Sequence, residues 1–93
     1  MPRIRCHPGE ILREEFMVPL ALSARQLASQ IGVPANQISE LMRERRGLTA
    51  VTAIRLGKYF GTDARFWLTM QQGFELSKTE AETGYSRIEP RAA

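Results

Sequence analysis

The apolar residues at the centre of the chain recur at helical spacing in two short runs separated by a glycine. Leu27 and Ile31 precede Gly32, whereas Ile38 and Leu41 follow it. Residues three or four apart share one face of a helix, so each run predicts a short amphipathic helix. Gly32 can adopt the positive φ that a tight turn between helices needs. The pattern therefore predicts two helices packed through these apolar faces, which is a helix-turn-helix motif.

Capping signals divide the rest of the chain into further helices. Ser23 and Gln26 have the spacing of a capping box, and Gly61 follows an apolar helical run. The expected helices are residues 8–19, a second from the Ser23 cap to about 31, a third from Pro34 to about 43, a fourth from the Thr49 cap to 60, and a fifth from the Thr62 cap to 76. No strand-like alternation is long enough to compete. The sequence predicts an all-α, compact bundle of five helices.

Length and composition describe one small domain. The chain has 93 residues, enough for a single core. We expect residues 1–76 to form a DNA-binding and dimerisation domain and residues 77–93 to form a polar, flexible tail. A lone cysteine agrees with a reducing compartment. No run approaches the ~20 apolar residues of a membrane span, and none has the form of a signal peptide. We therefore expect a cytoplasmic protein with no membrane partner.

Positive charge is concentrated around the helix-turn-helix. Residues 20–65 hold seven basic and three acidic side chains, although the whole chain has a net charge of only +3. A basic stretch at a helix that could read DNA favours a nucleic-acid partner. Solvated helix faces are often mildly basic as well, so charge alone leaves both interpretations open.

The sequence lacks the residues that catalysis or metal binding requires. Cys6 and His7 are the only cysteine and histidine, fewer than the three or four ligands of a zinc site. Glu14 and Glu15 are adjacent and so point to different faces of a helix. No glycine-rich phosphate loop or nucleophile elbow is present. We expect no enzyme activity, no metal and no cofactor, and a structural or incidental role for Cys6 and His7.

The third helix supplies the candidate base-reading residues. The amides of Asn36 and Gln37 suit adenine, and Arg43 could contact guanine or a phosphate. Glu40 could accept from a cytosine amine, or pair with Arg43 or with a loop arginine such as Arg45. The base-reading candidates are Asn36, Gln37, Ser39, Glu40 and Arg43. The backbone-contact candidates are Ser23, Gln26, Arg45 and Arg46.

The fifth predicted helix carries the most aromatic run of the chain. Its apolar residues exceed what one helix of a small bundle needs for the core, and leftover apolar surface usually meets a partner. The alternative is that these residues all face inward and complete the core. The candidate dimer interface consists of Phe66, Trp67, Leu68, Met70 and Phe74.

The chain resembles the HigA/VapI antitoxins of bacterial toxin–antitoxin modules, within the wider Xre/Cro group of lambda-repressor-like helix-turn-helix proteins. The resemblance covers roughly residues 6–76 and is carried by His7-Pro8-Gly9-Glu10, the helix-turn-helix run and Phe66-Trp67-Leu68. It implies a homodimer that represses its own operon at an inverted-repeat operator. It also implies neutralisation of a HigB-type toxin of the RelE class. The alternative is a stand-alone Xre-family regulator with no toxin partner.

The resemblance also suggests where a toxin would bind. A toxin that cleaves messenger RNA should be basic and should therefore seek acidic surface. Glu10, Glu14 and Glu15 lie on the first predicted helix, away from the reading helix. We expect these three residues to contribute to toxin contact.

Overall fold

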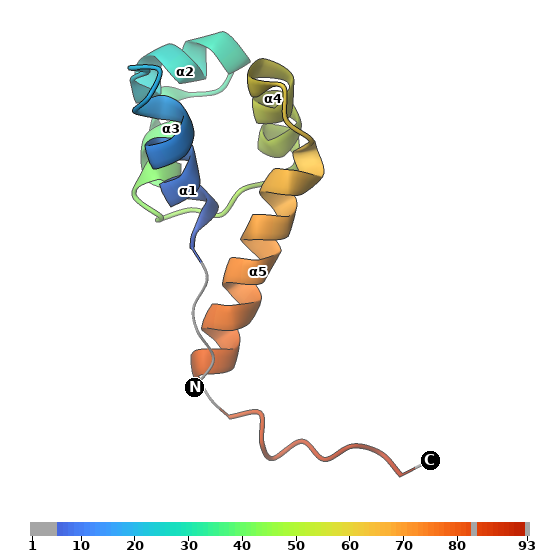
Figure 1. Ribbon diagram of the computed structural model, residues 1–93. Helices are drawn as coiled ribbons and strands as arrows, with labels where there is room; N and C mark the ends of the chain where they lie inside the picture. Colours follow the sequence, from blue (N-terminus) through green and yellow to red (C-terminus); the bar gives the residue numbers. More distant parts are fainter. Residues whose placement is uncertain (1–5, 83, 93) are drawn as a thin grey trace.

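The computed structural model describes residues 6–82 and 84–92 and contains helices and no strand within those ranges (Figure 1). This confirms the all-α fold class, including its five α-helices. The elements are α1 (Pro8–Ile11), the π-helix η1 (Leu12–Met17), α2 (Ala24–Ile31), α3 (Ala35–Met42), α4 (Ala50–Phe60) and α5 (Ala64–Glu82). Residues 1–5 of the predicted domain and residues 83 and 93 of the predicted tail lie outside the described residues.

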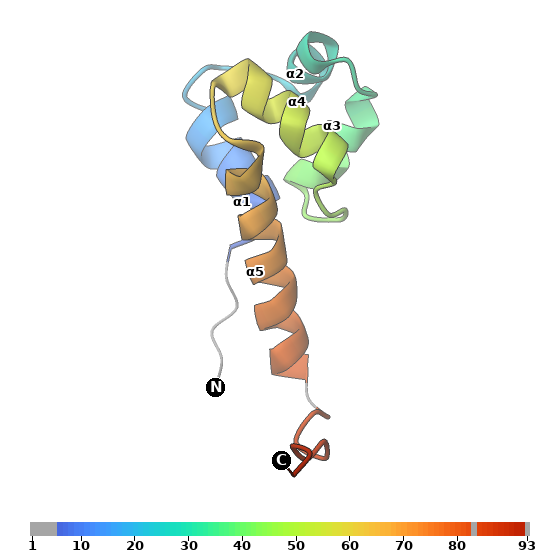
Figure 2. The same cartoon turned by 90° about the vertical axis from the view of Figure 1, so that its right-hand side faces the viewer.

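The helices form a head from which the last helix projects. α1, η1, α2, α3 and α4 surround the core, while the far half of α5 extends away from them in both views (Figures 1 and 2). The principal extents are 53 × 23 × 21 Å, and the long dimension comes from the far half of α5 and the residues that follow it.

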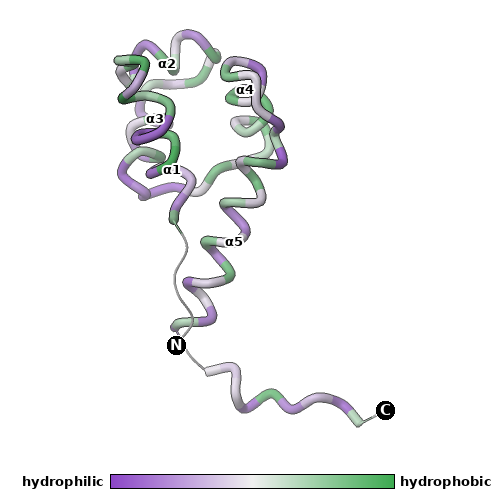
Figure 3. The backbone as a smooth tube through the Cα atoms, in the orientation of Figure 1, coloured by the Kyte–Doolittle hydropathy of each residue, from purple (hydrophilic) through white to green (hydrophobic). Residues whose placement is uncertain are grey.

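The core lies inside the head and is built from the predicted apolar faces. Leu27 and Ile31 of α2 and Ile38 and Leu41 of α3 are buried in one cluster, as the spacing predicted. Every helix of the head carries hydrophobic residues (Figure 3). Leu12, Leu56 and Trp67 have no exposed surface and tie η1, α4 and α5 to the same cluster.

Most of the predicted helix ends are confirmed. The Gln26 N–H donates to the Ser23 hydroxyl at 3.1 Å, and the Ser23 N–H donates to the Gln26 side-chain oxygen at 2.9 Å. Gly32 and Gly61 have φ of +75° and +73°, which glycine adopts at little cost. At α5, however, Asp63 supplies the capping oxygen by accepting from the Arg65 N–H at 2.8 Å.

The first helix differs from its prediction in type. We expected regular helix over residues 8–19, but α-helix gives way to π-helix from Leu12 to Met17. The Val18 N–H donates to the Arg13 carbonyl, five residues back, at 2.9 Å. A π-turn accommodates one extra residue per turn, and an apolar i, i+4 pair does not reveal that extra residue.

The last helix is longer than expected. α5 continues to Glu82, so the first six residues of the predicted tail are helical, whereas residues 84–92 lie outside any helix and are exposed. Once a helix is nucleated, extending it through residues of high helix propensity such as Glu, Lys and Ala has a small free-energy cost. No helix within the described ranges is both long and apolar enough to cross a membrane.

His7 holds the beginning of α1. Its side chain is buried, its Nδ1 accepts the Gly9 N–H at 2.9 Å, and its ring meets the edge of Phe74 at 4.7 Å between centroids. This confirms the structural role that we expected for His7. Burial lowers the pKa of His7 below its ordinary value of 6.5, although the charge of Glu44 opposes this shift.

The lowered pKa of His7 predicts a loss of stability in mild acid. In the unfolded chain His7 binds a proton below its ordinary pKa of 6.5, whereas in the folded chain it binds that proton only at lower pH. The contribution of His7 is therefore complete above pH 6.5 and disappears as the pH falls through the folded pKa. Urea unfolding at pH 7.5 and pH 5.5 measures this. His7→Asn keeps a capping oxygen without titrating, so its stability should change less over this window. Equal losses in both proteins would contradict the role of His7.

Candidate nucleic-acid interface

The turn between α2 and α3 fixes how the third helix is presented. The N–H groups of Gly32 and Val33 both donate to the Ala28 carbonyl, at 2.8 and 3.0 Å, which closes the end of α2. Arg55 of α4 donates to the Ile31 carbonyl at 2.6 Å. These bonds satisfy backbone acceptors that the end of α2 would otherwise leave open. The turn is therefore held from both sides.

Asn36 and Arg43 are the most available of the candidate base-reading residues. Both are exposed, at the beginning and the end of α3. Within the described part of the chain, neither side chain has an ion pair, and Asn36 makes no side-chain hydrogen bond. The Ser39 hydroxyl, in contrast, donates to the Ala35 carbonyl at 3.2 Å. An amide at the start of the helix and a guanidinium at its end suit base-edge and base or phosphate contacts respectively.

Gln37 is held by a residue that the sequence analysis did not identify. Its side-chain amide donates to the Thr52 hydroxyl at 2.7 Å, and the Thr49 hydroxyl donates to the same oxygen at 3.3 Å. Thr52 lies 15 residues away on α4 and is buried. This bond uses one N–H of the Gln37 amide, so the amide oxygen can still accept a hydrogen bond. Nothing in the linear pattern marks Thr52, because it lies within an apolar helical run.

Glu40 pairs with a loop arginine. The Arg46 guanidinium lies 3.2 Å from the Glu40 carboxylate, so the loop-arginine option is the one observed, with Arg46 in place of Arg45. Both side chains remain about 40% exposed, and an ion pair at such exposure contributes little to stability. Its effect is to offset a negative charge on the face that would meet DNA.

The four backbone-contact candidates are not equivalent. The side chains of Ser23 and Gln26 are used in the capping box, and Arg46 pairs with Glu40. Arg45 is exposed and has no ion pair in residues 6–82 and 84–92. It is therefore the candidate whose charge is most available to a phosphate.

Arg13 is a basic residue of this face that sequence reasoning missed. A hollow of about 240 Å³ is lined by Arg13 of η1, Ala24 at the start of α2, Ser39 and Met42 of α3, and Arg43, which caps the end of α3. Arg13 donates to the Met42 carbonyl and also pairs with Glu14 at 2.9 Å. Its hydrogen bond with Glu14 raises the pKa of Arg13, so it stays charged. Arg13 lies in a charge-balanced segment, and only the packing of η1 on α3 reveals its position.

The candidate dimer residues divide between core and surface. Trp67 has no exposed surface, and its indole N–H donates to the Thr62 hydroxyl at 2.8 Å. Trp67 therefore belongs to the core, and its assignment to an interface is wrong. Phe66 is 42% exposed, while Leu68, Met70 and Phe74 are partly buried.

The candidate toxin-contact residues lie on α1 and η1. α1 packs on α3 and Arg13 of η1 bonds to the Met42 carbonyl, so this segment is not away from the reading helix as we expected. Glu14 and Glu15 are exposed, Glu10 is half-buried, and Glu14 pairs with Arg13.

Within the described ranges, no three histidine, cysteine or acidic side chains are arranged to hold a metal ion.

The helix-turn-helix family model matches residues 12–67, which are more than half of the chain. The chain belongs to the helix-turn-helix family. It is 51% identical over 82 residues to virulence-associated protein I of Dichelobacter nodosus, covering 88% of this chain and 74% of that protein. It is also 40% identical over 73 residues to the uncharacterized regulator YbaQ of Escherichia coli K12, covering 78% of this chain and 65% of YbaQ.

The structure of this helix-turn-helix protein is similar to that of a DNA-bound antitoxin. The structure of Pseudomonas aeruginosa antitoxin HigA with the higBA promoter matches with a TM-score of 0.87 and 41% identity, covering 97% of this chain and 98% of that one. The resemblance to HigA/VapI-type proteins is thereby confirmed. Membership in this family of DNA-binding regulators also agrees with the expectation that the protein is not an enzyme.

Proposed function

We propose that this helix-turn-helix protein is a HigA-type antitoxin that binds operator DNA as a homodimer, represses its own operon and neutralises a HigB/RelE-type toxin that cleaves messenger RNA. The observation that carries the proposal is the 41% identity, over almost the whole chain, to a HigA antitoxin bound to its promoter. The exposed Asn36 on α3 and the exposed Arg43 at its C-terminal cap support it. A protein that represses an operon works in the cytoplasm.

Each copy would insert α3 into the major groove. Asn36 and the positioned Gln37 would contact base edges, with Ser39, Glu40 and Arg43 further along the same helix. Arg45 and Arg46 would contact phosphates, together with the start of α2 at Ser23 and Gln26. Arg13 and Arg43 line a hollow at that same start of α2. Their positive charge would attract a phosphate there.

Substitutions should separate base reading from phosphate contact. Asn36→Ala should cost about 1–3 kcal/mol on an inverted repeat from the protein's own promoter and much less on scrambled DNA. Arg45→Ala should weaken binding to both DNAs and reduce the salt dependence of binding, because it removes one phosphate contact. Fluorescence anisotropy at several salt concentrations measures both effects. The matched control is Ser86→Ala, an exposed position after the end of α5.

An Asn36→Ala protein that binds both DNAs as tightly as the unchanged protein would refute the assigned reading role. A reversal, in which Arg45 changes sequence preference and Asn36 changes only overall affinity, would exchange the two roles.

Toxin contact is proposed for the acidic side of the head. Glu10, Glu14 and Glu15 would attract a basic, RNA-binding toxin, and such complementary charge mainly speeds association. Growth rescue on co-expression with the neighbouring gene's product should survive Asn36→Ala and weaken when the three glutamates become lysine. Full rescue by that charge-reversed protein, shown to be folded, would move the contact elsewhere.

A stand-alone regulator is the second candidate. The 40% identity to YbaQ, whose name describes a transcriptional regulator and no toxin, favours it. Under this alternative the protein would bind the same kind of operator without a protein target. A short neighbouring gene for a basic, growth-inhibiting protein supports the antitoxin, and the absence of such a gene supports the regulator.

A further inference from the structure

Helix α4 has two apolar faces, and the core uses only one of them. The inward face consists of Thr52, Ala53, Leu56 and Gly57, which are buried. On the opposite face, Val51 and Ile54 are 61% and 51% exposed although both are large aliphatic residues. They are three positions apart and so lie on the same side of the helix. An apolar stripe left in water beside a satisfied core face is typical of an interaction surface.

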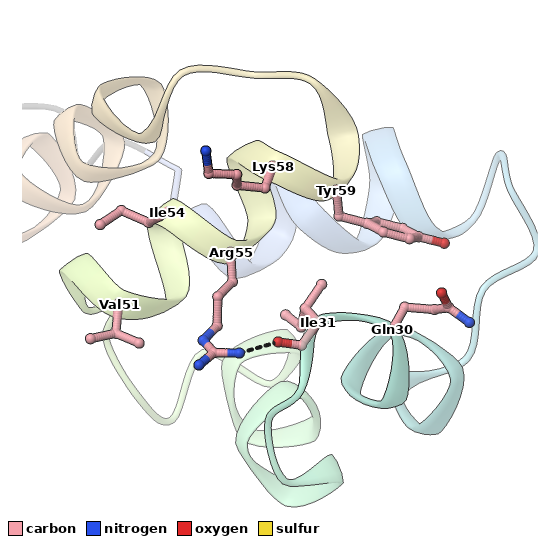
Figure 4. A pocket seen from close by; sticks show the side chains of 7 residues that line it. All are labelled: Gln30, Ile31, Val51, Ile54, Arg55, Lys58 and Tyr59. Carbon is pink, nitrogen blue, oxygen red and sulfur yellow. Dashed lines mark hydrogen bonds between the residues drawn. The ribbon is translucent and has the colours of Figure 1, made fainter.

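This outer face borders a groove against α2. The groove has a volume of about 550 Å³ and is lined mainly by Ile31, Val51, Ile54, Arg55, Lys58 and Tyr59 (Figure 4). Arg55 points from α4 towards α2, where it binds the Ile31 carbonyl. Neither α2 nor α4 contains an acidic residue. The groove is therefore apolar with a basic border, and it suits an apolar helix that carries acidic residues.

The far end of α5 presents such a surface. Leu76 is 63% exposed, and a shallow hollow of about 300 Å³ beside it is lined by Gln72, Glu75, Leu76 and Thr79. Glu80 lies four residues after Leu76 and therefore on the same side of the helix. From Glu75 to Glu82 the helix holds three acidic residues and one lysine. Its exposed face thus combines an apolar residue that suits the groove with the acidic charge that α2 and α4 lack.

These two surfaces do not meet within one chain. Both views show α5 leaving the head at the end of α4, with its far half pointing away from α2 and α4 (Figures 1 and 2). A second copy can bring them together. A two-fold axis would produce the same contact twice, with the groove of each copy receiving the helix end of the other.

We propose that the α4 groove receives the far end of α5 from a second copy, with Ile54 against Leu76 and Lys58 near Glu80. The proposal rests on the homodimer of the proposed function and names its surface. It differs from the sequence-based interface, which lay on the first half of α5. Gln37 is bonded to Thr52, so the groove helix also supports α3, and a dimer built on α4 would fix the two reading helices relative to each other.

Sedimentation velocity of the full chain without DNA tests the contact. Ile54→Glu places a charge in the apolar groove, and Leu76→Ser removes the apolar residue that enters it. Each should raise the dimer dissociation constant about tenfold or more while leaving the circular dichroism spectrum unchanged. The matched control is Leu20→Glu, because Leu20 is 60% exposed and lies between η1 and α2, outside the groove lining.

A charge exchange makes the test specific to this pairing. Lys58→Glu and Glu80→Lys should each weaken the dimer severalfold, and the double variant should recover most of the affinity. An unchanged dissociation constant for Ile54→Glu, purely additive losses in the double variant, or a wild-type chain that stays monomeric at every concentration would overturn the proposal. Operator binding is measured separately. Dimers that fail to bind the operator would refute the DNA function and leave this contact intact.

Discussion

Gly9→Ala should destabilise the protein by about 3 kcal/mol or more, or prevent folding. Alanine normally stabilises a helix relative to glycine by about 1 kcal/mol, so the expected sign is opposite to the usual one. The reason is the close approach of α1 to α3. A Cβ on Gly9 would overlap the carbonyl oxygen and carbon of Leu41, which are backbone atoms and cannot rotate away. Urea unfolding monitored by circular dichroism measures the loss.

Gly61→Ala provides the contrast. A Cβ at Gly61 meets no atom within 4 Å, so this substitution should cost only the strain of a left-handed backbone, about 1–2 kcal/mol. A Gly9→Ala protein as stable as the unchanged chain would show that α1 does not pack on α3 as described. Because α3 carries the reading residues, such a result would also weaken the account of the DNA-binding face.

Trp67→Ala should cost about 3–5 kcal/mol of unfolding free energy. The indole has no exposed surface and packs against the rings of Phe16 and Phe66 at 5.0 and 5.1 Å between centroids. Its N–H donates to the Thr62 hydroxyl, so truncation leaves a cavity and removes a hydrogen bond at once. The same urea titration measures this variant.

Phe66 is the matched control for Trp67. It is adjacent in sequence, aromatic and 42% exposed, so Phe66→Ala should cost clearly less. If Trp67→Ala instead gave a stable monomer, with the loss confined to dimer affinity, then Trp67 would be an interface residue and the core assignment would fail.

The helix-turn-helix could be predicted from sequence because its signals are local. Gly32 terminates α2, Ser23 and Gln26 cap its start, and the spacing of Ile38 and Leu41 gives the buried face of α3. Each of these signals lies within a few residues of the feature that it specifies. Local signals of this kind survive folding when the tertiary packing agrees with them.

The features that sequence reasoning missed depend on contacts between distant residues. The Gln37–Thr52 bond joins residues 15 positions apart, and the Arg13–Met42 bond joins residues 29 apart. The burial of Trp67 depends on where α5 crosses the head, which no helical period encodes. The π-helix of η1 is only six residues long, which is too short for a hydrophobic pattern to distinguish its period from that of an α-helix.

Nuclease footprinting on the protein's own promoter tests the central claim most directly. Helix-turn-helix proteins pair two half-sites about one helical turn, ~34 Å, apart, so a dimer with two α3 helices should protect an inverted repeat at that spacing. Protection should fall steeply as salt rises, because phosphate contacts release counterions. Two symmetric protected half-sites that disappear from a scrambled repeat are the expected result. A single protected site, or equal protection of the scrambled DNA, would contradict the account of a dimeric, base-reading repressor.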